Sequence, residues 1–268
     1  MKKPARKSVT APQQVAKIPS ENSVGPDSAL LRLQLCFFLS GAAGLIDQVV
    51  WTKALGQLFG YSAYAVATVL AVFMGGLALG SAIFAQWRPA NKSGVALYSW
   101  MEFAIAASTL LSLPGIALVK QLYLTSYPHA GGSAATLLAL RFFGATMVLA
   151  LPTALMGGTL PVLLGGVARE VKQLGIRAGR FYAVNTAGAV AGTIAAGFFL
   201  IPWMGLRLTL ITAVILNVIA GLLAQRIAQP IAVASEDVRA KRAKVQSSAL
   251  YMVCFAAVGA TAIAYELS

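Results

Sequence analysis

Seven polar side chains lie inside long apolar stretches of this chain, and they are the first candidates for chemistry. They are Asp47, Gln48, Glu102, Arg141, Asn185, Tyr265 and Glu266. A charged side chain in hydrocarbon costs at least about 2.5–3.5 kcal/mol on insertion scales, so its presence there needs an explanation. Carboxylates around an internal cavity would bind a cation or relay protons. In the structural alternative, Glu102 and Arg141 extend toward the lipid headgroups and Asn185 bonds a neighbouring helix.

No catalytic or metal-binding set accompanies these groups in the sequence. The single histidine, His129, falls in a predicted loop, and the two cysteines, Cys36 and Cys254, lie far apart in apolar stretches. Metal sites draw on clusters of histidine, cysteine and carboxylate, and covalent catalysis needs a nucleophile beside a base. We therefore predict no catalytic residue, no metal and no cofactor, and an enzyme working inside the bundle is the least favoured hypothesis.

The elements that must position the polar groups are predicted to be transmembrane helices. The 268 residues are 58% hydrophobic and 11% charged, whereas about one-quarter of the residues of a soluble domain are charged. Apolar stretches of roughly 20 residues, enough to span a bilayer as a helix, recur along the chain. They are Leu30–Val50, Tyr61–Gln86, Val95–Val119, Ala134–Leu164, Phe181–Trp203, Leu206–Gln225 and Ala249–Ser268. The sequence thus predicts an all-α polytopic membrane protein with about seven transmembrane helices.

The basic residues predict the orientation of these helices. The net charge is +13, and seventeen of the 21 lysines and arginines fall on one side of the predicted spans. Cytoplasmic segments carry this excess, so we expect an inner-membrane protein of bacteria with a cytoplasmic N-terminus. Residues 1–29 are predicted to be a disordered basic tail, and residues 226–248 a basic cytoplasmic loop. A lipid or nucleic-acid contact is the alternative explanation of the charge, and we expect the bilayer but no nucleic acid as a partner.

Two similar stretches of the sequence predict an internal repeat. The stretch "CFFLSGAAGLIDQ" (Cys36–Gln48) and the stretch "CFAAVGATAIAYE" (Cys254–Glu266) share four residue types in one register, and both end in polar pairs at the same depth. We therefore predict a six-helix unit over residues 30–225, followed by the first helix of a second unit over residues 249–268. We expect either a truncated product or further units supplied by another polypeptide.

Glycine and proline predict both close packing and a helix break. The pairs Gly76/Gly80 and Gly188/Gly192 have the spacing that lets helix backbones approach closely. The stretch "LPTALMGGTLPVLLGG" places Pro152, Gly157, Gly158 and Pro161 within one apolar span. Proline removes a backbone donor and disrupts a helix interior. We expect a kinked or broken helix there, of the kind that marks substrate sites in transporters, or else a helix that ends at the interface and turns along it.

Three of these stretches together resemble a known family. The segments Gly41–Ser81, Leu151–Leu163 and Gly179–Arg207 are similar to the membrane portion of bacterial spermidine-synthase-like proteins, in which a major-facilitator-like region is fused to a spermidine synthase domain. The resemblance covers nearly the whole chain from about Leu30 and implies a facilitator-like bundle. The family pattern has Tyr-Glu where this chain has Asp47-Gln48, although Tyr265-Glu266 keeps it. The chain lacks the glycine-rich nucleotide turn of a synthase domain, so it is not expected to transfer aminopropyl groups by itself.

Two functions follow as hypotheses. The first is a non-catalytic membrane domain that anchors or serves a partner, either a separate synthase-like chain or the other subunits of a membrane complex. The alternative is half of a major-facilitator-like secondary transporter for a cationic metabolite such as a polyamine. The acids in the predicted spans favour the transporter hypothesis. The absence of a catalytic motif agrees with the transporter and with the partner-serving domain alike.

Overall fold

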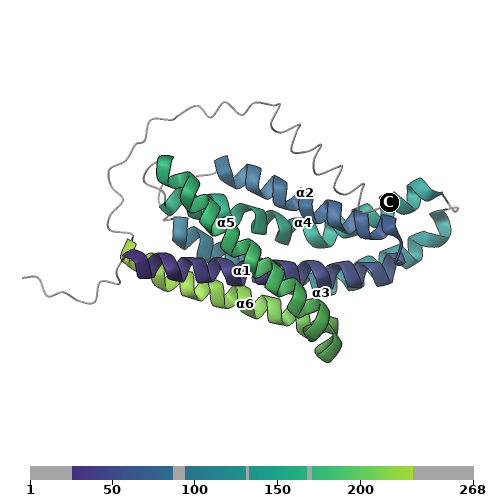
Figure 1. The fold of residues 1–268 in the computed structure, drawn as a ribbon. Helices are drawn as coiled ribbons and strands as arrows, with labels where there is room; N and C mark the ends of the chain where they lie inside the picture. The colour runs from purple at the N-terminus through teal and green to yellow at the C-terminus, as the bar shows by residue number, and fades with distance from the viewer. Residues whose placement is uncertain (1–25, 87–93, 131–132, 168–170, 232–268) are drawn as a thin grey trace, which may run out of the picture.

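The protein is an elongated bundle of helices. The structure, a computed structural model, describes residues 26–86, 94–130, 133–167 and 171–231 (Figure 1). Within these ranges the elements are α1 (Pro26–Phe59), α2 (Ala63–Gln86), α3 (Gly94–Ser126), the 3-10 turn η1 (Tyr127–Ala130), α4 (Ala134–Val167), α5 (Val171–Ile194), the π-helical turn η2 (Ala195–Leu200) and α6 (Ile201–Ile231). The predicted seventh span, with Tyr265 and Glu266, lies outside the described residues, as does most of the two predicted basic segments.

Five helical stretches are long and apolar enough to cross a membrane, against the seven spans that the sequence predicts. They are Ser28–Phe59, Ala63–Gln86, Gly94–Ser126, Ala134–Leu164 and Ala178–Ile227. The fifth stretch contains two of the predicted spans, Phe181–Trp203 and Leu206–Gln225, as one run of 50 residues. The fold is thus all-helical in its described part, and its apolar helices indicate a multi-pass membrane protein.

The fifth stretch reverses direction at Gly205. This residue has φ 76° and ψ 176°, a backbone conformation that only glycine adopts readily. Figure 1 shows α6 returning alongside α1 from the end that α5 reaches. A straight helix of 50 residues would be about 75 Å long, far more than the roughly 30 Å of hydrocarbon in a bilayer. The reversal falls between the two spans that the sequence predicts here.

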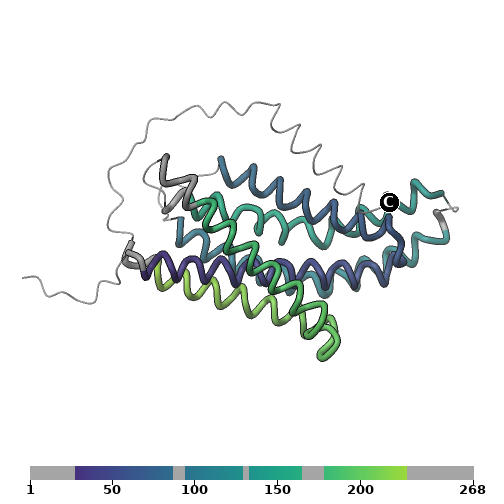
Figure 2. The backbone as a smooth tube through the Cα atoms, in the orientation of Figure 1, coloured from purple at the N-terminus to yellow at the C-terminus, as the bar shows by residue number. Residues whose placement is uncertain are grey.

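Each helix packs against particular neighbours. α1 lies against α5 and α6, α2 against α4, and α3 between α4 and α6. Figure 2 shows α5 crossing α1 obliquely, whereas the other helices run roughly along one axis. The buried apolar residues form two clusters, one around Phe37 and Phe181, the other around Trp51, Phe73 and Leu149. Buried polar residues of α1 and α3, among them Asp47, Glu102 and Thr109, lie beside these clusters, and the candidate site begins there.

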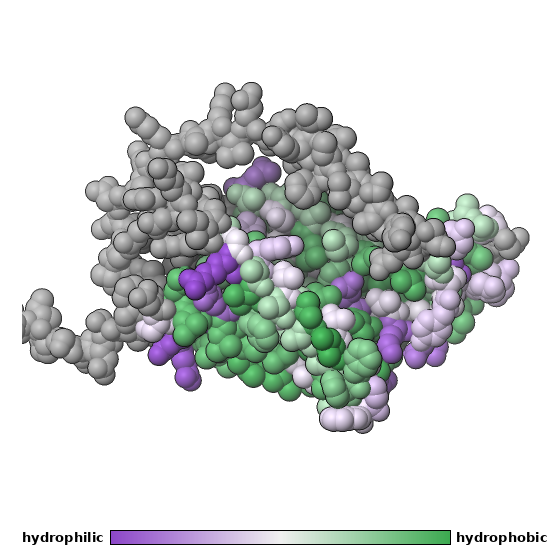
Figure 3. All heavy atoms as spheres, in the orientation of Figure 1, coloured by the Kyte–Doolittle hydropathy of each residue, from purple (hydrophilic) through white to green (hydrophobic). Residues whose placement is uncertain are grey.

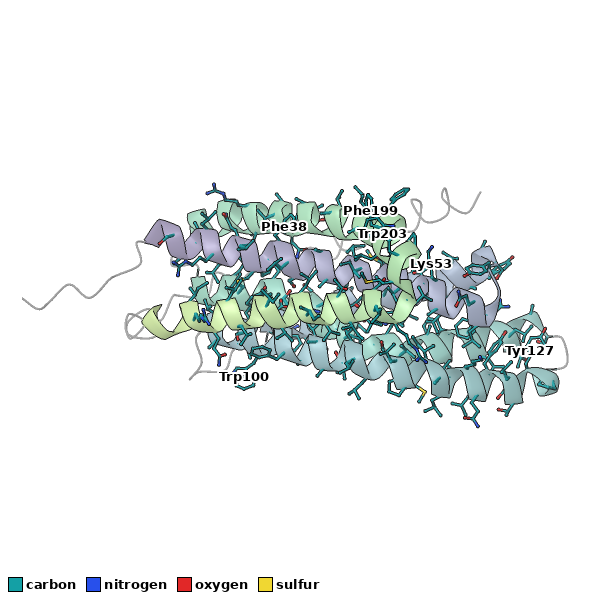
Figure 4. The ribbon with its side chains drawn as sticks, turned by 90° about the horizontal axis from the view of Figure 1, so that it is seen from below. Phe38, Lys53, Trp100, Tyr127, Phe199 and Trp203 are labelled. Carbon is teal, nitrogen blue, oxygen red and sulfur yellow. The ribbon has the colours of Figure 1, made fainter. Side chains whose placement is uncertain are left out.

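The outer surface of the bundle is apolar, as a membrane environment requires. Large apolar side chains such as Leu79, Phe143 and Trp203 are more than half exposed, and apolar side chains cover much of the helical face that Figure 3 shows. Phe199 and Trp203 lie together near the α5–α6 reversal (Figure 4), with ring centroids 5.7 Å apart. Tryptophan is enriched at membrane–water interfaces, which suits a reversal at one such interface.

The fourth span is one continuous helix, so the broken form of the predicted helix is not observed, whereas a kink at these residues stays a prediction. α4 is helical from Ala134 to Val167, through Pro152, Gly157, Gly158 and Pro161, so it is neither divided into two pieces nor ended early. The glycines serve a different purpose. A β-carbon at Gly157 would overlap the backbone of Leu77 on α2, and one at Gly158 would overlap the ring of Phe84. The pair of glycines therefore lets α4 approach α2 closely.

Candidate functional site

Polar side chains of α1 and α3 face each other along a line that we call the α1–α3 seam. It consists of Cys36, Ser40, Asp47 and Trp51 on α1 and of Tyr98, Glu102, Thr109 and Ser112 on α3. On each helix these residues are three, four or seven positions apart, which places them on one face of a helix. The two helices run parallel through the bundle (Figure 1), so each pair meets at its own depth.

Asp47 lies within a chain of hydrogen bonds that joins α1 to α3. The Thr109 hydroxyl donates to Asp47 Oδ2 at 3.0 Å, and the Ser112 hydroxyl donates to the Thr109 carbonyl oxygen at 2.6 Å. The Trp51 indole N–H donates to Ser112 Oγ at 2.9 Å. Asp47 is 0% exposed, and its Oδ1 has no hydrogen-bond partner. The carboxyl group therefore has one partner across the seam and one oxygen without any.

Glu102 lies on α3 seven residues before Thr109, the partner of Asp47, and it has fewer hydrogen-bond partners than Asp47 has. The side chain is 0% exposed, and neither carboxyl oxygen forms a hydrogen bond. The hydroxyls of Ser40 and Tyr98 are its polar neighbours, together with the Cys36 thiol, but no hydroxyl is in hydrogen-bonding geometry with it. Polar groups buried in proteins are nearly always hydrogen-bonded, so two unpartnered oxygens on one buried acid are unusual.

Asn217 of α6 lies at the same depth as Glu102. The Ser99 hydroxyl of α3 donates to the Gly221 carbonyl oxygen of α6 at 2.8 Å, which fixes the level of the two antiparallel helices. Glu102 is three residues beyond Ser99 and Asn217 is four residues before Gly221, so they lie about 4.5 Å and about 6 Å along the axis from that bond. Asn217 is 1% exposed, and its Nδ2 has no hydrogen-bond partner. Two helices, α3 and α6, thus bring unpartnered polar groups to one level.

No opposite charge compensates the two acids. Among the side chains that the structure describes, Asp47 and Glu102 are the acids, and neither forms an ion pair. A lone carboxylate buried away from water is strongly unfavourable unless a cation or a proton joins it. No group of three histidine, cysteine, aspartate or glutamate side chains in the described ranges lies close enough to hold a metal ion. The chemistry that this arrangement suits is the binding of a cation or a proton.

The other predicted site residues lie away from the seam. Asn185 donates from Nδ2 to the Phe37 carbonyl oxygen at 3.0 Å, and so joins α5 to α1 as the structural alternative expects. Arg141 lies near the start of α4, half-buried, with an unpartnered Nε. Gln48 is half-buried beside Asp47 on α1. Of the described candidates, the structure brings only Asp47 and Glu102 onto one seam.

The predicted packing glycines make close helix contacts. A β-carbon at Gly80 would overlap the Ala154 backbone of α4, and one at Gly76 would overlap the Thr153 side chain. On α5, β-carbons at Gly188 and Gly192 would overlap backbone atoms of α1. Both glycine pairs therefore act within this bundle, as their spacing predicts, and they fix α2 on α4 and α5 on α1.

Several seam residues were missed by the sequence reasoning. They are Cys36 as a neighbour of the acid, Ser40, Trp51, Tyr98, Thr109, Ser112 and Asn217. On α3 the signal was present, because Tyr98, Glu102, Thr109 and Ser112 share one helical face, so that the polar residues around Glu102 form a stripe. Asn217 had no comparable signal, since it stands alone among apolar residues.

No family model, no curated protein and no solved structure matches the chain in any of three comparisons.

Proposed function

We propose that this chain is one membrane-embedded unit of a secondary carrier, which binds a cation at the α1–α3 seam. One observation carries the proposal: Asp47 and Glu102 are buried on facing helices without an ion pair, and both oxygens of Glu102 lack a hydrogen-bond partner. Acids within membrane helices mark ion and proton pathways in pumps and transporters. A domain that only anchored a partner would have no need of an uncompensated acid between its helices.

The resemblance to the membrane part of spermidine-synthase-like proteins supplies the finer terms of the proposal. Residues 30–225 would form a six-helix facilitator-like unit, in which the stretch Ala178–Ile227 crosses the membrane twice around Gly205, and residues 249–268 would begin a second unit. The solute would be a cationic metabolite such as a polyamine. The chain would lie in a bacterial inner membrane with its N-terminus in the cytoplasm, and it would not itself be an enzyme.

Uptake into proteoliposomes tests the carrier proposal. The full chain is reconstituted, with any chain that co-purifies, and the uptake of labelled spermidine is compared between wild type, Glu102→Gln and Asp47→Asn. The matched control is Gln121→Ala, a change at an exposed polar residue of the same helix α3. We expect Glu102→Gln to abolish uptake and Gln121→Ala to retain it. Wild-type uptake that persists in both acid variants contradicts the proposal.

A second candidate is the non-catalytic domain that serves a partner, and the outer face of α2 favours it. Small residues line that face at Ala71, Gly75, Ala78 and Ala82, all exposed. A β-carbon at Gly75 would have no neighbour within 4 Å, so the face is open to close approach by another helix. A tag at the N-terminus, mild detergent and mass measurement test this candidate. A synthase-like chain that co-purifies at fixed stoichiometry supports it, whereas a chain that purifies alone contradicts it.

A further inference from the structure

We infer that Glu102 is a proton-binding site of this domain and that the cation it takes is a proton rather than a metal ion or an organic amine. The inference rests on the proposed function and deepens it, since it names the ion that would be coupled to transport. It assigns Asp47 a different task, the joining of α1 to α3. Ser40, Tyr98 and Asn217 become positioning residues for the Glu102 carboxyl.

The closure of the site around Glu102 excludes a larger cation. Glu102 and Tyr98 are both 0% exposed. On one side the Phe37 ring stacks on Tyr98 with centroids 5.2 Å apart, and it packs edge-on against Phe181 at 5.4 Å. On the other side the seam continues into the apolar cluster around Trp51. An organic ammonium would need volume at this level, whereas a proton needs none.

The ligands available around Glu102 are too few for a hard metal ion. Divalent cations of the calcium or magnesium type take about six or more oxygen ligands. The groups at this level are the Glu102 carboxyl, the hydroxyls of Ser40 and Tyr98 and the side-chain amide of Asn217. The amide and the hydroxyls are also donors, and a donor suits a carboxyl group better than it suits a metal ion.

Among the described residues, no positively charged side chain faces Glu102. From α1 come Cys36 and Ser40, and from its own helix comes Tyr98. On α6, Asn217 lies at a similar level, and the described basic residues Arg207 and Arg226 are exposed. On α4 the nearest described charged group is Arg141, 17 residues before Gly158, which contacts Met101 at this level. That separation is about 25 Å along the helix. A proton added to one carboxyl oxygen therefore removes the only charge that the described residues place at the site.

The hydrogen bonds distinguish Glu102 from Asp47. Asp47 accepts a hydrogen bond from Thr109 and belongs to the chain of hydrogen bonds that ends at Trp51. A change in the protonation of Asp47 would therefore disturb contacts of both α1 and α3. Glu102 has the Ser40 and Tyr98 hydroxyls as neighbours, but neither of its oxygens has a hydrogen bond of good geometry. A protonated carboxyl both donates and accepts hydrogen bonds, and the neighbouring hydroxyls of Ser40 and Tyr98 can also do both. Release of the proton needs the carboxyl to reach water, which requires the seam to open.

Infrared difference spectroscopy on the full chain in lipid bilayers tests the inference directly. The stretching band of a protonated carboxyl is recorded in H₂O and in D₂O, where exchange of the proton shifts it. We expect a carboxylic-acid band that Glu102→Gln removes and Asp47→Asn leaves in place. Tyr98→Phe, which removes one hydroxyl and keeps the ring, should shift this band without removing it, so the test survives if Glu102→Gln does not fold.

The outcomes separate this inference from the carrier proposal. A wild-type spectrum with no band that responds to Glu102→Gln or to Tyr98→Phe overturns the proton site, even if uptake of spermidine is observed. A band that responds to both variants establishes the proton site, even if wild-type protein takes up no spermidine. In that second case the carrier proposal for a polyamine fails and the proton site stands.

Discussion

Alanine at Gly80 should destabilise the bundle, because the contact between α2 and α4 leaves no room for a methyl group. A β-carbon there would overlap the backbone of Ala154, with the Ala154 Cα only 2.8 Å away. Backbone cannot rotate aside as a side chain can, so the two helices must move apart. The matched control is Gly75→Ala on the same helix, at an exposed glycine whose β-carbon would meet nothing within 4 Å.

The expected size of the effect follows from two opposing terms. Alanine is a better helix former than glycine by about 0.8–1.0 kcal/mol, and this gain applies to both positions. Overpacking costs about 1–3 kcal/mol and applies only at Gly80. The difference in unfolding free energy between the two variants is therefore about 1–3 kcal/mol. In a domain of this size each kcal/mol shifts the Tm by about 2–4 °C, so the variants should differ by about 2–12 °C.

Thermal unfolding in mild detergent, followed by circular dichroism, measures this difference. Gly75→Ala should unfold at or slightly above the wild-type temperature, and Gly80→Ala clearly below it. If Gly80→Ala unfolds at the same temperature as Gly75→Ala, then α2 and α4 do not approach as closely as the structure places them. The explanation of the glycines in α4 would then fail with it, since Gly157 lies in the same contact.

Three further predictions use the same unfolding measurement. Gly205→Ala should lower the unfolding free energy by about 1–3 kcal/mol, because the backbone conformation of this residue suits glycine alone. The control Gly197→Ala, at a glycine with open surroundings, should not lower it. Equal effects of the two changes would refute the reversal at Gly205. Trp51→Phe should lower the unfolding free energy by about 0.5–1.5 kcal/mol through the lost hydrogen bond to Ser112, in addition to any loss of packing. The hydrogen-bond contribution should be absent when the same change is made in a Ser112→Ala variant. Pro152→Ala should be tolerated or stabilising, since α4 is already helical there; loss of folding would show that the proline is required.

The positions of the helices were predictable because hydropathy alone determines them. The expected span Ala134–Leu164 lies within α4, and the expected span Tyr61–Gln86 ends where α2 ends. The boundary between the fifth and sixth predicted spans falls at Gly205, where the chain does reverse. Burial in hydrocarbon requires long apolar helices whatever their neighbours are, so no tertiary information is needed for this part.

The behaviour of α4 was not predictable from local propensity. Pro152 and Pro161 suggest a break because each removes a backbone donor, yet the helix continues. The Thr153 hydroxyl donates to the Leu149 carbonyl oxygen at 2.7 Å, and α2 packs along the same turn. The unbroken helix thus coincides with a close contact to α2. The glycines were interpreted as a hinge, whereas their role depends on which helix lies opposite, and a single sequence does not give that.

The candidate site was predictable in part for the same reason. Two acids in apolar spans were visible at once, but their meeting on one seam depends on α1 and α3 being parallel neighbours at the same depth. Thr109 and Ser112 can be recognised as hydrogen-bond partners only when the structure places Asp47 and Trp51 opposite them. A lone asparagine such as Asn217 is indistinguishable in sequence from one that bonds a neighbouring helix, which is what Asn185 does.

The way in which the helices are held indicates where the bundle would open. Glycines hold α5 on α1 and α2 on α4 with backbones in contact, and separating such pairs would lose many packed atoms at once. Across the α1–α3 seam no glycine of the described residues brings the backbones together, and the contacts include the Thr109–Asp47 and Trp51–Ser112 hydrogen bonds beside the stacking of Phe37 on Tyr98. Water can replace a hydrogen bond but cannot replace packing, so the seam is the least costly place for water to enter. Glu102 lies on that seam, so opening of the seam would bring this buried acid to water.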